Sequence, residues 1–142
     1  KKAQVETSVK KILKEEEDFG IKKFTTYQNF GKKVYKIREN VIKNLKKLKE
    51  TKNLIIGYGA PAKATTALNF FGIKKEIDYI VEDNKLKHNK FVPGVNIPIK
   101  NKATIKNKKN TILVLAWNFF QDIKKNNFSI SNNFINIKQL EK

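Results

Sequence analysis

The sequence predicts an α/β fold with a mainly parallel sheet, preceded by two N-terminal helices. Short apolar runs alternate with helical patterns along residues 53–142, which is typical of βαβ units. The run at 54–56 passes through a glycine pair into a helix-forming segment. The run at 111–115 is apolar throughout, as expected for a strand buried on both faces. Together these observations indicate a Rossmann-like three-layer sandwich in one domain, with a helical lead-in over 1–52 and an α/β core over 53–142.

Composition narrows the possible functions. The chain has 142 residues and a formal charge of +18, which raises nucleic acid as a partner. The lysines are spread along the whole chain and Arg38 is the only arginine, so we do not expect a nucleic-acid binder. The sequence contains no cysteine, which excludes disulfides and thiol catalysis and argues against a zinc site within these residues.

The lengths of the apolar segments and the first residue of the chain indicate where the protein is found and whether the sequence is complete. No segment approaches the roughly 20 apolar residues that cross a bilayer, so we expect no membrane span. The chain starts at Lys1 without a methionine, and we therefore expect a piece of a longer protein. We expect that protein to be cytoplasmic.

Two helices are expected in the lead-in. Residues 1–18 form an amphipathic pattern that stops before Gly20, a helix-stop signal. Its apolar face consists of Val5, Val9, Ile12 and Leu13. A capping box with Thr25 as N-cap and Gln28 reaching back begins the second helix, which runs to about Glu50. Its apolar stripe, expected to lie against the sheet, consists of Phe30, Val34, Ile37, Val41, Leu45 and Leu48.

A glycine turn follows the strand at 54–56. Gly57 is predicted to take a positive φ, and Gly59 to allow a backbone or ligand to come close. Pro61 suits a first helical turn, and Ala62 supplies a small residue for tight packing of helix on strand. Such a turn leaves unpaired N–H groups at a positive helix end, which favours an anion. The glycine pair alone is compatible with a plain strand-to-helix turn and with a phosphate or nucleotide site.

The remaining elements are placed by apolar runs and by turn residues. In chain order we expect a helix from Pro61 to Phe71 ended by Gly72, a strand at 77–81, a loop at 85–99, a short helix at 102–108, a strand at 111–115, a helix at 119–125, a strand at 134–137 and a polar tail. The right-handed crossover rule makes the sheet parallel, with the strands in the order 77–81, 54–56, 111–115 and 134–137.

Polar residues follow two of these strands at their carboxyl ends, where open α/β sheets contact ligands. Asp83 lies about 20 residues after the glycine turn, where dinucleotide-binding folds place a partner of the ribose hydroxyls. It can instead cap a turn together with Asn84. Trp117 and Asn118 follow the strand at 111–115, and Trp117 either packs in the core or stacks on a ligand.

Three stretches of the sequence carry a specific pattern: GYGAPAKATTALNFFGI at 57–73, IDYIVEDNKLKHNKFVPGVNIPI at 77–99 and ILVLAWNF at 112–119. Together, in this order and spacing, they resemble the C-terminal domain of sugar-nucleotide C-methyltransferases. The helical lead-in also fits, so the resemblance covers nearly the whole chain. The sequence departs from the family at Glu82 and Asp83, an acidic pair where an aspartate is usual, and in the tail after Ile137, which lacks a proline-rich end.

The resemblance implies the C-terminal domain of a larger enzyme that uses S-adenosylmethionine to methylate a carbon of a nucleoside-diphosphate deoxysugar. In this family a zinc-binding N-terminal part and a middle domain that holds S-adenosylmethionine precede the C-terminal domain. The sugar nucleotide would lie in a cleft between the last two domains. The implied partners are therefore a nucleoside-diphosphate sugar and the methyltransferase domain of the same parent chain. No cofactor, metal ligand or catalytic residue is expected within this sequence, and the isolated chain is expected to be inactive.

We expect this domain to hold the substrate at the ends of its strands. The expected contacts are Gly57, Tyr58, Gly59, Ala60, Pro61, Lys63, Asp83, Asn84, Lys87, Trp117 and Asn118. In this interpretation Lys63 and Lys87 are charge partners for the diphosphate, although either side chain can simply be solvated.

Two alternatives stay open at this point. The first is the NAD(P)-binding domain of an oxidoreductase, with Gly57, Gly59 and Ala62 at the pyrophosphate and Glu82 or Asp83 at the ribose. The second is a basic, non-catalytic module that binds nucleic acid or another subunit.

Overall fold

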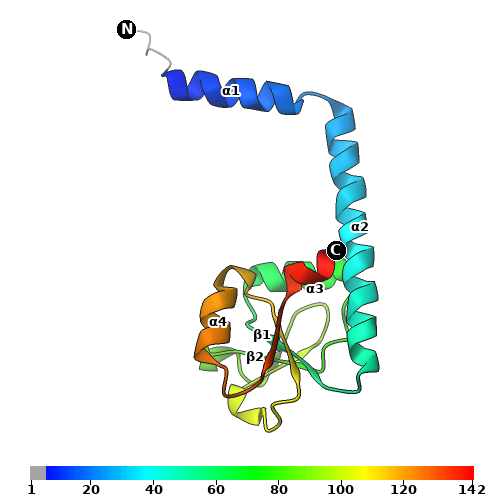
Figure 1. Cartoon of the computed structure of the whole chain (residues 1–142), viewed down its shortest axis with the longest axis vertical. Helices are drawn as coiled ribbons and strands as arrows, with labels where there is room; N and C mark the ends of the chain where they lie inside the picture. Colours follow the sequence, from blue (N-terminus) through cyan, green and yellow to red (C-terminus); the bar gives the residue numbers. More distant parts are fainter. Residues whose placement is uncertain (1–5) are drawn as a thin grey trace. The chain divides into compact units, whose positions relative to one another are not determined.

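The computed structural model describes residues 6–142 (Figure 1). Val5, expected on the first helix, lies outside the described residues. The chain divides into two compact units, Lys1–Lys36 and Ile37–Lys142, with the boundary inside the second helix. No helix in the described part of the chain is long and apolar enough to cross a bilayer.

The first unit contains helix α1 (Thr7–Phe19) and the start of helix α2 (Phe24–Glu50). Gly20 takes a φ of +78° and donates its N–H to the carbonyls of Glu16 and Glu17, so the predicted helix stop is confirmed. The N-cap predicted at Thr25 is wrong, because α2 already begins at Phe24 and Thr25 lies inside the first turn. The two helices are joined by a tight connection in which the Thr26 hydroxyl donates to the carbonyl of Gly20.

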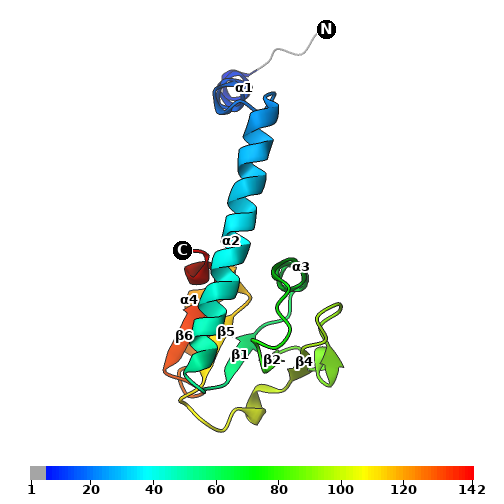
Figure 2. The same ribbon diagram turned by 90° about the vertical axis from the view of Figure 1, so that its right-hand side faces the viewer.

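The second unit is built on a six-stranded sheet in the order β3-β4-β2-β1-β5-β6 (Figure 2). The strands are β1 (Ile55–Tyr58), β2 (Tyr79–Val81), β3 (Lys90–Phe91), β4 (Pro98–Lys100), β5 (Thr111–Val114) and β6 (Asn133–Asn136). All neighbours pair parallel except β3 and β4, which are antiparallel. The α/β class and the predicted central order β2-β1-β5-β6 are confirmed.

The hairpin of β3 and β4 was not predicted, since residues 85–99 were expected to form a loop. Lys90 pairs with Ile99 and Phe91 with Pro98, and β4 then extends the sheet beside β2. Strands of two and three residues are too short to show a period-two apolar pattern. Pro98 stands at the first position of its strand, where a missing N–H is tolerated.

Helices and short turns connect the strands. They are α3 (Ala62–Phe71), α4 (Phe120–Asn126) and the 3₁₀ turns η1 (Lys85–Lys87), η2 (Lys102–Thr104), η3 (Trp117–Phe119) and η4 (Ile137–Glu141). The helix expected at 102–108 is reduced to η2. The C-terminal tail is tied to α2, because the amides of Asn40 and Asn44 donate to the carbonyls of Glu141 and Leu140 at 3.0 Å each. The tail was expected only to be polar, and it buries the Leu140 side chain in the core.

The alternating side chains of the strands form two core clusters, one on each face of the sheet. Ile55, Ile80 and Leu113 pack with the second half of α2 and with α3. Ile56 and Ile112 lie in the other cluster, against which α4 packs. In Figure 1 the cyan-green half of α2 and the orange α4 lie on opposite sides of the strands. The predicted three-layer sandwich is therefore confirmed.

The apolar stripe of α2 contacts the core over only part of its length. Val41 and Leu45 are fully buried, and Ile37 and Leu48 pack partly buried against them. Phe30, which belongs to the same predicted stripe, is 66% exposed. The predicted contact with the sheet is thus confirmed from Ile37 onward.

Candidate functional site

A cavity of about 330 Å³ lies at the carboxyl ends of β1, β2 and β5. Its lining residues are Tyr58, Gly59, Pro61, Glu82, Asp83, Lys87, Ala116, Phe119 and Ile123. The three corners that follow these strands therefore share one pocket, as parallel strands predict. Within the predicted site, the structure brings Tyr58, Gly59, Pro61, Asp83 and Lys87 together around it.

The positive φ predicted for Gly57 is wrong, whereas the close approach of backbone predicted at Gly59 is confirmed. Gly57 lies inside β1 and has no positive φ. A Cβ there would sit 2.7 Å from Cγ1 of Ile80 and 3.0 Å from Cδ1 of Leu115, so close packing requires the glycine. Gly59 makes the turn instead, with a φ of +86°, and its backbone approaches Ala116.

The start of α3 also differs from expectation. Pro61 is the N-cap with a φ of −73°, one residue before the first helical turn. Ala62 is exposed, so it does not supply the tight contact between helix and strand. Ala64, which is 1% exposed, packs in the core cluster in its place.

Glu82 is anchored to the glycine turn. Its Oε2 accepts the N–H of Ala60 at 2.8 Å, and its Oε1 accepts the N–H of Asn84 at 3.1 Å. Nζ of Lys87 lies 3.4 Å from Oε2 and donates to the carbonyl of Ala60 at 3.0 Å. Burial alone would raise the pKa of the Glu82 carboxyl, but these N–H groups and the Lys87 charge outweigh it, and the pKa lies below its usual value.

Asp83 is held by a second set of contacts. The Tyr58 hydroxyl donates to Oδ2 of Asp83 at 2.8 Å, and Nζ of Lys102 lies 3.1 Å from Oδ1. The pKa of Tyr58 is raised well above its ordinary value. Burial is the larger cause, and the hydrogen bond to Asp83 is the second. Burial acts to raise the pKa of Asp83, but the bonds from Tyr58 and Lys102 outweigh it and lower the pKa. The Tyr58 hydroxyl therefore stays protonated and orients the carboxylate.

The other predicted residues lie outside the lining of this cavity. Asn84 caps η1, where its side chain accepts the N–H of Leu86 at 3.0 Å. Nζ of Lys63 lies 4.4 Å from the centroid of the Trp117 ring, a cation–π contact between α3 and η3. Trp117 also packs partly buried against the core, and Asn118 is exposed. No observation tests a ligand contact for any of the predicted residues, so the site as a whole remains a prediction.

Several residues of the cavity were not predicted. Phe119 and Ile123 stand four residues apart after β5, and this helical spacing is a signal that could have found them. Two residues that do not line the cavity hold residues that do: Oδ1 of Asn127 accepts the Tyr58 hydroxyl at 3.2 Å, and Lys102 pairs with Asp83. Nothing in the sequence marks either residue, because only the folded chain brings them beside Tyr58.

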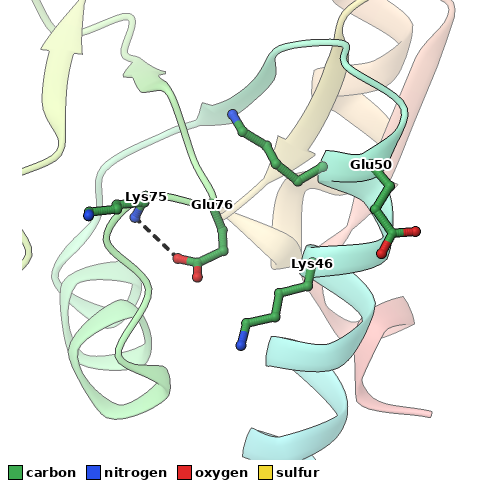
Figure 3. Close-up of a pocket in the computed structure, with 5 residues that line it drawn as sticks. Lys46, Glu50, Lys75 and Glu76 are labelled. Atoms are coloured by element: carbon green, nitrogen blue, oxygen red, sulfur yellow. Dashed lines mark hydrogen bonds between the residues drawn. The ribbon is translucent and has the colours of Figure 1, made fainter.

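A second hollow, of about 360 Å³, lies between the end of α2 and the loop that follows α3 (Figure 3). It is lined by Lys46, Lys49, Glu50, Lys75 and Glu76. Lys49 is already paired with Asp78 at 2.6 Å, and the carboxylate of Glu76 accepts the N–H of Lys75 at 3.2 Å. All five lining residues are charged, and none of them follows the carboxyl end of a strand. We therefore take the cavity where the ends of β1, β2 and β5 meet as the candidate site.

No group of three or more histidine, aspartate or glutamate side chains that could hold a metal ion occurs within residues 6–142.

Comparison with known proteins gives consistent results. Residues 1–135 match the sequence model of the family described as C-methyltransferase C-terminal domain. The chain is also similar to C-methyltransferase NovU of Streptomyces niveus, with 28% identity over 122 residues. That alignment covers 84% of this chain and 29% of NovU, so the chain spans less than a third of the length of that relative.

Proposed function

The chain belongs to the C-methyltransferase C-terminal domain family, and from this premise we propose that it is the substrate-holding domain of a C-methyltransferase that uses S-adenosylmethionine. In this proposal the substrate is a nucleoside-diphosphate deoxysugar. The observation that carries the proposal is the cavity at the carboxyl ends of β1, β2 and β5. Ligands of open α/β sheets bind at this edge.

The cavity combines the two kinds of surface that a deoxysugar presents. Phe119, Ile123 and Pro61 supply apolar walls for the ring carbons and the deoxy positions. Asp83 supplies a carboxylate oriented by Tyr58 and Lys102, which can accept hydrogen bonds from sugar hydroxyls. The role of these residues is to bind and orient the sugar and to exclude water from it.

The parent enzyme would remove a proton from a carbon beside a keto group of the sugar, and the resulting enolate would attack a methyl group. The new carbon–carbon bond forms as the bond between that methyl and its donor breaks. A positioned base and stabilisation of the enolate oxygen lower the barrier of such a reaction. We assign neither role to this domain, which contributes substrate positioning.

S-adenosylmethionine would supply the electrophilic methyl group. The glycine turn of this domain offers no free N–H at Ala60 to an anionic group of the donor, because that N–H already donates to the Glu82 carboxylate. We therefore place the donor, and the zinc of the family, in other parts of the parent protein.

The proposed partner of this domain is the methyltransferase domain of the same parent chain. Large apolar side chains on α1 and on the first half of α2 support this proposal, since they are exposed in the structure. They include Ile12 at 54%, Leu13 at 56%, Phe24 at 75% and Phe30 at 66%. Exposed apolar surface of this kind is typical of a face that contacts another domain.

Binding of a sugar nucleotide to the 142-residue chain tests the proposed function. UDP-glucose and dTDP-glucose serve as probes, followed by amide chemical shifts, which detect weak binding. Phe119→Ala should weaken probe binding by about tenfold, because it removes an apolar wall of the cavity. The matched control is Phe128→Ala, since Phe128 is 73% exposed and does not line the cavity.

Equal effects of the two phenylalanine variants, or no shift of any cavity residue with either probe, would contradict the proposed function. A Lys63→Met variant addresses the predicted charge partner separately. Unchanged affinity would remove Lys63 from the site and leave its contact with Trp117 as its role.

A further inference from the structure

The glycine turn already binds an anionic side chain of the same chain, the carboxylate of Glu82. In nucleotide-binding folds, the glycine turn between a strand and a helix N-terminus directs its backbone N–H groups toward a phosphate. Here the N–H of Ala60 is directed at Oε2 of Glu82, at 2.8 Å. The Glu82 side chain is only 14% exposed, and its second oxygen accepts the N–H of Asn84.

The surrounding charges keep this arrangement neutral. Lys87 pairs with Glu82, and its ammonium also binds the carbonyl of Ala60, so it closes a ring of contacts around the turn. Asp83 is paired in the same way with Lys102. A diphosphate that entered the cavity would lie beside two carboxylates, and both nearby lysines would have to leave their partners to neutralise it.

We propose that Glu82 fills the phosphate position of the glycine turn, so that the cavity takes the uncharged sugar ring of the substrate and the diphosphate stays outside it. This inference rests on the proposed function and assigns Glu82 as a residue that determines specificity. The occupied N–H of Ala60 also distinguishes this turn from a dinucleotide-binding turn, because a dinucleotide-binding turn needs that N–H for the pyrophosphate.

The size and lining of the cavity agree with this assignment. Ligand cavities span about 300–1,000 Å³, so about 330 Å³ suits one ring and not a whole sugar nucleotide. The Phe119 side chain is 60% exposed and can pack on the face of a sugar ring. The Asp83 side chain is 59% exposed and can accept further hydrogen bonds from hydroxyl groups.

Anion binding by the 142-residue chain tests the inference, with Glu82→Gln as the variant. The probes are inorganic pyrophosphate, UDP and UDP-glucose, in a buffer free of phosphate and sulfate. The wild-type chain should bind pyrophosphate at least tenfold more weakly than the variant, because the amide of glutamine keeps the shape of the side chain and removes its charge. Glu76→Gln is the matched control, since Glu76 also accepts backbone N–H groups but lies in the hollow between the end of α2 and the loop that follows α3.

The wild-type chain alone provides a second measurement, which needs no variant to fold. UDP-glucose should shift the signals of Phe119 and Ile123, whereas pyrophosphate should leave the amide signal of Ala60 unmoved. A wild-type Ala60 amide that titrates with pyrophosphate would overturn the inference, as would equal pyrophosphate affinities of wild type and Glu82→Gln. Loss of UDP-glucose binding with the tenfold pyrophosphate effect intact would instead contradict the proposed function alone.

Discussion

The two compact units use similar amphipathic helices in different ways. In residues 37–142 the apolar positions of α2 are covered by the sheet, and Val41 and Leu45 are fully buried. In residues 6–36 the described part of α1 contains no buried residue, and Phe30 of α2 remains 66% exposed. The spacing of the apolar residues is the same on both sides of the boundary. An amphipathic pattern therefore predicts which face of a helix is apolar, but not what covers that face.

Truncation of one apolar residue on each side of the boundary should show the largest difference. Leu45→Ala removes a fully buried side chain from the core and should lower the free energy of unfolding by about 2–5 kcal/mol. Phe30→Ala should change it by no more than about 0.5 kcal/mol, because the ring contacts mostly solvent. Urea unfolding followed by Trp117 fluorescence measures the effect of Leu45→Ala, since both residues lie in the second unit. Circular dichroism, which follows the helices of both units, measures the effect of Phe30→Ala.

The comparison would fail if Phe30→Ala were as destabilising as Leu45→Ala. Repeating the measurement over a hundredfold range of protein concentration identifies the cause. A concentration-dependent effect would mean that a second copy of the chain covers Phe30 in solution.

Replacing one glycine by alanine in each compact unit should change the stability of the fold in opposite directions. Gly57→Ala should destabilise by about 1–3 kcal/mol, because the new Cβ would lie 2.7 Å from Cγ1 of Ile80 in the packed sheet. Gly31→Ala should stabilise α2 by about 0.5–1 kcal/mol, because no atom lies within 4 Å of the new Cβ and alanine favours the helix.

Thermal unfolding followed by circular dichroism measures both glycine variants. A stabilising Gly57→Ala would show that the contact between β1 and Ile80 is loose. A destabilising Gly31→Ala would show that the first half of α2 packs against another surface in solution.

The smallest expected effect is a pH dependence of the free energy of unfolding, which arises from two carboxyl groups of the second unit. The folded pKa values of Glu82 and Asp83 lie below their unfolded values, so the unfolded chain binds more protons in acid. Their stabilisation is complete above about pH 5, where both carboxyls are also ionised in the unfolded chain, and it is lost as the pH falls through the folded pKa values. Glu82→Gln should therefore flatten the decline of unfolding free energy in acid, measured by urea unfolding at several pH values.

Asp83→Asn should act in the same direction with a smaller effect, since the Asp83 side chain is 59% exposed. An acid decline that is identical in wild type and both variants would mean that neither carboxylate keeps its hydrogen bonds in solution.

The candidate site could be predicted from the sequence only in outline. Parallel strands end at one edge, so residues that follow β1, β2 and β5 had to meet there. The contacts between them could not be predicted in the same way. Glu82 was assigned to a possible ribose, but its carboxylate binds the N–H of Ala60. Asn127 reaches the Tyr58 hydroxyl from the end of α4, at a sequence separation that no local pattern records.

The prediction for the glycine turn was wrong in one detail, and the reason is again packing between distant residues. The spacing of the glycines suggested a positive φ at Gly57, whereas the structure places it at Gly59. The need for a glycine at position 57 comes from Ile80 and Leu115, which belong to neighbouring strands. A local motif shows where small residues occur, and the packing around each of them decides which one is required for conformation and which for space.

The sequence by itself determined the α/β class, the order of the four central strands and the edge where the cavity lies. These features follow from local periodicity, turn residues and the handedness of crossovers, all of which act over short stretches of chain. Only the tertiary structure decided that the turn holds Glu82, that β3 and β4 extend the sheet, and that the stripe of α2 is covered from Ile37 onward. Those outcomes depend on atoms from distant parts of the chain competing for the same backbone groups and the same space.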